Sequence, residues 1–169
     1  MHHRATFLLG AVALLGEGCS MFLHAQGGAV IGTSGAVGGA LEASGGFGSG
    51  STGQGSQSGY GYEATLRMKV SPDLVSAAIG SGGYLASMGS DYFVWAHAGM
   101  HLVQLDVLDR RAQVSAFSPY TSFGYGFRLS DGARLTVGLS MEYDLRFEAP
   151  DEGFFGLQLG YAGFGAQGR

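Results

Sequence analysis

The sequence has 169 residues, which is the length of one domain of ordinary size. Its formal net charge is −4 and only 13% of its residues are charged, so it lacks the basic surface that a nucleic-acid partner requires. The 32 glycines follow no collagen period, and the aliphatic and aromatic residues between them argue against a chain that is disordered throughout. A single cysteine excludes a disulfide within the chain.

Residues 1–18 are predicted to form a helical export signal. Met1 to Arg4 is short and weakly basic, and Ala5 to Leu15 is an uncharged, largely apolar run. A helix that crosses a bilayer needs about 20 apolar residues, whereas a run of this length is typical of a signal peptide. A buried N-terminal helix is the alternative.

The only cysteine, Cys19, lies just after this run, in the segment Leu15-Gly16-Glu17-Gly18-Cys19-Ser20. The segment resembles the lipobox of bacterial lipoproteins at Gly18 and Cys19. It departs from that pattern at Gly16, where an aliphatic residue is usual, and at Glu17. The resemblance implies that Cys19 becomes the lipidated first residue of the mature chain, followed by a tether over residues 19–27.

Two other interpretations of this segment remain open. Cleavage after Ala25, at the end of Leu23-His24-Ala25, would remove Cys19 with the signal. Alternatively, Cys19 is a plain buried thiol. If the lipobox operates, Ser20 behind the cysteine resembles the sorting signal of outer-membrane lipoproteins in enteric-type bacteria.

Residues 28–169 are predicted to form a single β-domain. Residues 27–43 alternate loosely between apolar and small residues, which favours a strand interrupted by glycine, or else a flexible linker. Residues 44–59 are almost entirely Gly, Ser, Gln and Thr, and we expect a flexible Gly/Ser-rich loop there.

A second strand is predicted over residues 60–70, where apolar side chains alternate with polar ones. The polar face carries Glu63, Arg67 and Lys69. This face is either a solvated surface or one half of an ion-pair network inside the protein. In the second case its partners would be Glu142, Asp144 and Arg146, because buried charges need counter-charges.

The central part of the chain has less regular patterns. Ser71-Pro72-Asp73 can begin a turn or a short helix, and the region 74–90 is interrupted by glycines. Residues 92–108 are apolar at both odd and even positions and predict a long strand, and residues 112–120 begin another strand. Asp106 and the turn Asp109-Arg110-Arg111 are expected to form local ion pairs in solvent.

The clearest alternation runs from Leu135 to Phe147, where every odd position is apolar and every even position is small, polar or charged. Side chains alternate across a strand, so one face is wholly apolar. Residues 123–129 and 155–162 show the same pattern. The turns between these runs are Ser130-Asp131-Gly132 and Glu148 to Gly153, and Asp-Gly is a strong hairpin signal. Three strands of an antiparallel meander are predicted.

The polar face of these strands is rich in Gly and Ser and carries few charges, which suits the packed interior of a narrow barrel. The apolar face, with Tyr and Phe near the strand ends, suits contact with lipid. A soluble sandwich or barrel with this face inward would give the same alternation. We therefore expect an all-β fold, an antiparallel meander that closes into a barrel of about eight strands. The eighth strand would lie near residues 21–26 or 84–88.

In length, alternation and loop placement, residues 28–165 resemble the small eight-stranded outer-membrane barrels. Those barrels usually end on an aromatic residue, whereas this chain continues for five residues after Phe164. The resemblance implies a bacterial outer-membrane location, contact with membrane lipid and a non-enzymatic structural or surface-interaction role, with an unidentified surface or periplasmic protein as partner. The alternative is a lipid-anchored periplasmic sandwich or lipocalin-like domain that binds a small apolar ligand.

Two pairs of side chains are candidates for metal binding or acid–base chemistry. His97 and His101 on one strand face would lie about 13 Å apart, too far to share a metal ion. Glu142 and Asp144 share a face, but no nucleophile or cleft accompanies them, so charge pairing within the sheet is favoured over acid–base catalysis. No catalytic residue, cofactor or metal ion is predicted, and the only predicted site is the lipidation site Cys19.

Overall fold

Nine β-strands follow one another along the part of the chain that the computed structural model describes, which comprises residues 18–72, 74–108, 111–115, 117–130, 133–147 and 150–166. Their bounds are β1 Gly18–Gly32, β2 Val37–Gly53, β3 Ser56–Val70, β4 Leu74–Met88, β5 Phe93–Leu108, β6 Arg111–Ser115, β7 Ser118–Ser130, β8 Ala133–Asp144 and β9 Glu152–Ala166. No helix in these ranges is long and apolar enough to cross a membrane.

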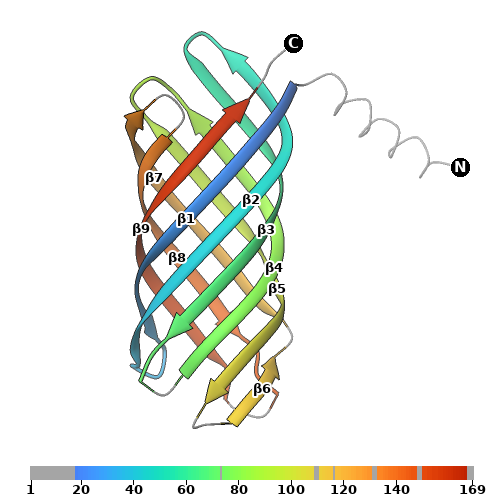
Figure 1. Cartoon of the computed structure of the whole chain (residues 1–169), viewed down its shortest axis with the longest axis vertical. Helices are drawn as coiled ribbons and strands as arrows, with labels where there is room; N and C mark the ends of the chain where they lie inside the picture. The colour runs from blue at the N-terminus through green and yellow to red at the C-terminus, as the bar shows by residue number, and fades with distance from the viewer. Residues whose placement is uncertain are drawn as a thin grey trace, which may run out of the picture.

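The strands close into an antiparallel barrel with eight positions around its wall (Figure 1). β1 pairs with both β2 and β9, so the first and last strands close the sheet. β6 and β7 share one position, because both pair with β5. Between them, Phe117 adopts a left-handed backbone with φ 79°, which interrupts one long strand. The predicted all-β, antiparallel barrel of about eight strands is confirmed.

The pairing registers define how far the strands are staggered. Starting at Met21 and stepping to the paired residue on each next strand, the path returns to β1 at Ile31, ten residues further along. The path is Met21, Phe47, Tyr62, Gly83, Ala98, Thr121, Met141, Phe155 and Ile31. With eight strands, this stagger tilts each strand by roughly 40° from the barrel axis and leaves an interior that side chains just fill.

The two faces of the wall have opposite character to those of a soluble barrel. On β8, Leu135, Leu139 and Met141 point outward and are 46%, 49% and 40% exposed. The residues between them, such as Ser140 and Glu142, are buried inside the barrel. The apolar face of the alternation therefore points outward, and the alternative of an inward apolar face with a small apolar ligand is not supported.

Each end of the barrel has its own set of connections. β1 starts and β9 finishes at the same end, which we call the terminal end (Figure 1). The connection between β2 and β3 lies at this end and consists of residues 54–55, where Gly55 has φ +73°. The opposite end, which we call the loop end, carries the connection over residues 145–151 and the β5–β6 hairpin.

Two sequence predictions about local structure are wrong. Residues 19–27, predicted as a tether, lie within β1 and pair with β2 and β9. Residues 44–53 and 56–59, predicted as a Gly/Ser-rich loop, belong to β2 and β3, and only residues 54–55 form the turn. The predicted signal peptide lies outside the described residues except for Gly18, which begins β1.

The glycines that suggested a loop instead make room for aromatic side chains inside the barrel. A Cβ atom at Gly46 would lie 2.9 Å from the Tyr84 ring, and one at Gly138 would lie 2.8 Å from the Trp95 ring. Real Cβ atoms almost never approach other atoms this closely. At these positions the absence of a side chain leaves room for a large inward ring.

Candidate functional site: the barrel interior

An aromatic cluster fills the interior near the terminal end. Its larger members are Phe22, Tyr84, Phe93, Trp95 and Phe164. Phe22 stacks on Tyr84 with ring centroids 5.1 Å apart, and Phe93 lies 6.3 Å from Phe164. We call these five residues the aromatic plug, because they close the interior across strands β1, β4, β5 and β9.

A histidine network lies next to the plug. His97 from β5 has its Nδ1 2.7 Å from Glu63 Oε1, and its other ring nitrogen contacts the Ser122 hydroxyl. The Tyr120 hydroxyl donates to the same Glu63 oxygen at 3.2 Å.

Ser122, His97 and Glu63 thus form a serine–histidine–carboxylate arrangement, which in other proteins can activate a nucleophile. Here the serine is 1% exposed and the histidine 2%, both enclosed by the barrel wall. Gln26 Nε2 also lies 3.5 Å from the Ser122 hydroxyl, on the interior side. A substrate would have to enter a packed interior to reach this hydroxyl, so the arrangement fits a structural hydrogen-bond network.

An ionic network occupies the interior nearer the loop end, with Glu142 at its centre. Arg67 Nε lies 3.1 Å from Glu142 Oε2, and Lys69 Nζ lies 3.3 Å from the same oxygen. His101 Nδ1 is 2.9 Å from Glu142 Oε1. Lys69 also contacts Asp144 at 2.5 Å. The interior ion-pair network, one of the two alternatives raised from the sequence, is confirmed.

Arg146 extends this network to the rim of the barrel. Its guanidinium lies 3.4 Å from Asp144, 3.1 Å from Glu152 and 3.7 Å from Asp106. The side chains of Arg67, Lys69, Glu142 and Asp144 are at most 3% exposed. Each buried charge in the network therefore has an opposite charge beside it, which offsets the cost of removing it from water.

The structure corrects the placement of Asp106, which was expected at a solvated turn. Asp106 is buried and accepts a hydrogen bond from Gln104 Nε2 at 2.9 Å. The register between β4 and β5 shifts at Ile79/Gly80, and Leu102 and Val103 are both exposed. This bulge reverses the facing of the residues that follow, so Gln104 and Asp106 point inward. Nothing in the sequence pattern marks the bulge.

The two histidines considered as metal ligands point into the interior from the same strand but bind different carboxylates. His97 contacts Glu63, and His101 contacts Glu142. Among the described residues, no group of three or more metal-ligating side chains is arranged to hold a metal ion.

The described interior contains more acidic than basic side chains. Its buried carboxylates are Glu42, Glu63, Asp106, Glu142 and Asp144, and its buried cationic groups are Arg67, Lys69 and Arg134, with Arg146 at the rim. His97 and His101 supply further donors, because each has a ring nitrogen within hydrogen-bond distance of a carboxylate. The histidines therefore serve as partners for the excess carboxylates.

Comparison with solved structures agrees with this architecture. The structure of Neisserial surface protein A aligns with a TM-score of 0.54 at 13% identity, over 86% of this chain and 96% of that one. The outer membrane enzyme PagL aligns with a TM-score of 0.52 at 13% identity, over 83% of this chain and 97% of that one. The chain has the fold of a small outer-membrane β-barrel.

The comparison does not extend to activity. One of these two proteins is described as a surface protein and the other as an enzyme, and function resides in sites rather than in the fold that carries them. No protein-family model matches the chain, and no curated protein sequence matches it.

Proposed function

We propose that this protein is a non-enzymatic β-barrel of the bacterial outer membrane with a structural or surface-interaction role. The observation that carries the proposal is the inversion of the wall, with aliphatic and aromatic side chains outside and charged ones inside. Leu157 and Leu159 are 60% and 64% exposed, whereas Asp144 is fully buried. An apolar outer band is stable only in lipid, and a closed barrel leaves no unpaired strand edge there.

Labelling of single cysteines tests this location. In a Cys19→Ala background, Leu139→Cys should react with a lipid-soluble maleimide in isolated outer membranes and resist a membrane-impermeant one. Ser140→Cys, one residue further along β8 and buried inside the barrel, should resist both reagents. Reaction of Leu139→Cys with the impermeant reagent would contradict membrane insertion.

The proposal that the protein is not an enzyme is supported by the burial of its one serine–histidine–carboxylate arrangement among the described residues. A fluorophosphonate probe labels activated serines, and we expect it to leave the folded protein unlabelled. Labelling that Ser122→Ala abolishes would assign a hydrolytic site to the interior.

A surface-interaction role would use the loop end. In outer-membrane barrels the longer connections face outside the cell and the short turns face the periplasm. The connection over residues 145–151 lies at the loop end, and the short turn at residues 54–55 lies at the terminal end. Residues 33–36, which join β1 to β2, also lie at the loop end. An epitope inserted there beside Ser34 should bind antibody on intact cells, and one inserted at Gly55 should not.

We also propose that processing leaves Cys19 as a lipidated first residue and does not cut after Ala25. Cleavage after Ala25 would remove Phe22 from the aromatic plug and the Ser20 hydroxyl from its bonds to Ser49 and Tyr84. It would also strip the partner strand from residues 161–166 of β9. Intact-mass measurement of the mature protein tests this, together with membrane retention of Cys19→Ala after a carbonate wash.

A further inference from the structure

A row of outward-facing residues connects Cys19 to the middle of the barrel wall. Cys19 is exposed and is the second residue of β1. It pairs with Ser49 on β2, which pairs with Tyr60 on β3. Tyr60 pairs with Leu85 on β4, and Leu85 pairs with Ala96 on β5. The five residues form one continuous line across five neighbouring strands.

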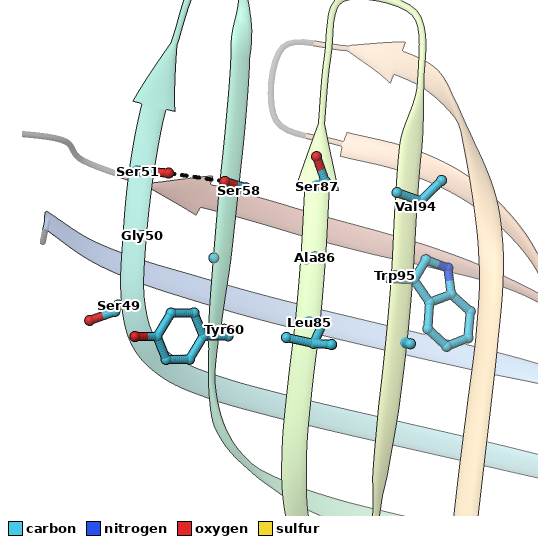
Figure 2. A pocket seen from close by; sticks show the side chains of 12 residues that line it. Ser49, Gly50, Ser51, Ser58, Tyr60, Leu85, Ala86, Ser87, Val94 and Trp95 are labelled. Atoms are coloured by element: carbon cyan, nitrogen blue, oxygen red, sulfur yellow. Dashed lines mark hydrogen bonds between the residues drawn. The ribbon is translucent and has the colours of Figure 1, made fainter. Parts of the chain in front are cut away.

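A groove of about 430 Å³ follows this line. Figure 2 shows Tyr60, Leu85 and Val94 projecting from neighbouring strands, with small residues between them. Its lining comes from residues 49–51, 58–60, 85–87 and 94–96. The groove thus has large apolar side chains as walls, and it begins at the strand partner of Cys19.

Ser49 provides a polar contact at the Cys19 end of the groove. It is 2% exposed, and its hydroxyl has no hydrogen-bond partner within the described residues. A buried hydroxyl of this kind is normally satisfied by an acceptor. A molecule with a carbonyl oxygen beside Ser49 and a hydrocarbon chain beyond it would match this hydroxyl and the apolar walls of the groove.

The stagger of the barrel directs this groove into the membrane. One circuit from β1 through β2 advances the row ten residues along β1, from Met21 to Ile31 and therefore toward the loop end. The line from Cys19 to Ala96 climbs in the same direction. A chain attached at the terminal end and laid along the groove would enter the apolar band.

We propose that the groove holds an acyl chain of a diacylglyceryl group attached to Cys19, with the Ser49 hydroxyl donating to an ester carbonyl. The inference rests on the proposed lipidation. In that step a thioether bond forms between Cys19 Sγ and the glyceryl carbon of a diacylglycerophospholipid. The bond from that carbon to the phosphate oxygen breaks, and the thiol proton passes to the departing phosphate headgroup.

Photo-crosslinking in cells fed a fatty acid with a terminal diazirine tests the inference. After irradiation of isolated outer membranes, peptide mapping should find the Cys19 adduct crosslinked to peptides that contain residues 58–60, 85–87 and 94–96. Ala96→Phe, which fills the groove, should abolish these crosslinks and leave the adduct mass unchanged. Ala77→Phe, the same change at an outward position of β4 that does not line the groove, should keep them.

Each contrary outcome has a separate meaning. An adduct on Cys19 whose crosslinks lie only on β7, β8 and β9 would overturn the groove assignment and leave the lipoprotein proposal standing. Absence of any adduct from the unaltered protein would overturn both. Crosslinks to the groove peptides that persist in Cys19→Ala would show a free lipid chain in the groove, which overturns the covalent assignment.

Discussion

At the scale of single residues, glycine and aromatic residues determine the packing of the interior. Gly124 and Gly138 both face the Trp95 ring, and Gly126 faces Phe93. In the sequence, the many glycines suggest a flexible chain. In the folded barrel, several of them instead leave space for aromatic rings that point inward. A methyl group added at these positions must displace a ring or the backbone beside it.

We expect Gly138→Ala to lower the free energy of unfolding by about 1–3 kcal/mol, the usual cost of overpacking. The new Cβ would lie 2.8 Å from Trp95 and 2.9 Å from the Phe123 carbonyl oxygen. Gly39→Ala is the matched control, because its nearest neighbour would lie 3.8 Å away. Urea titration of the two variants in lipid vesicles measures the difference, and equal midpoints would contradict this account of the glycines.

The buried charged residues of the interior are stabilised by the opposite charges beside them. Glu142→Gln leaves Arg67 and Lys69 with fewer buried counter-charges, and breaking such a pair costs roughly 3–5 kcal/mol. Glu152→Gln removes a carboxylate that is 12% exposed, at the rim. We expect a smaller loss there, since water can solvate the remaining partner. Unfolding titrations should rank the two variants in this order; the reverse order would place the centre of the network elsewhere.

At the scale of the strands, the alternation of β8 and β9 predicts their structure well, because their outward residues are apolar and their inward residues are mostly small or polar. The pattern fails where the aromatic plug lies. Phe22 in β1 and Phe93 and Trp95 in β5 point inward, so both faces of these segments read as apolar. The first half of β1 therefore resembles part of an export signal in the sequence.

The sequence alone left two possibilities for the charged face of residues 60–70: a solvated surface, or ion pairs with Glu142, Asp144 and Arg146 inside the protein. Glu63, Arg67 and Lys69 share one face of β3, and Glu142 and Asp144 share one face of β8. Whether these faces meet depends on closure of the barrel and on its stagger, which arise from pairing across the whole sheet. Gln104 and Asp106 were missed because a bulge reverses the facing of β5.

Substitutions in the first half of β1 test whether this segment belongs to the mature protein. We expect Phe22→Ala to destabilise the barrel by about 3–5 kcal/mol, because it removes a ring from the plug. Met21→Ala, at the adjacent outward position, should have a much smaller effect. The folded fraction can be followed by protease resistance of the mature protein in outer membranes. If both variants behave like the unaltered protein, the segment is removed before folding.

At the scale of the whole molecule, the apolar outer wall sets the protein in a bilayer at a defined depth. Leu139 lies within β8, and Leu145 follows the end of that strand. We expect Leu139→Arg to cost roughly 2–4 kcal/mol and Leu145→Arg roughly 0–1 kcal/mol, because the penalty for a lipid-facing charge falls from the midplane to the interface. Refolding into vesicles of defined lipid measures both, and equal penalties would contradict the assigned orientation.

The aromatic plug also determines how the protein affects the electrical resistance of the membrane that contains it. Phe22, Tyr84, Phe93, Trp95 and Phe164 close one part of the interior, and paired charges fill the part next to it. A hydrated ion would have no continuous water column to follow, because a barrel of this width is filled by its own side chains. We expect planar bilayers that contain the protein to remain as insulating as pure lipid. The double substitution Trp95→Ala/Phe93→Ala removes two rings of the plug. If this variant still folds, we expect it to raise the ionic current across the bilayer. That result would show that the plug blocks ion flow. The unaltered protein would therefore occupy membrane area without conducting ions.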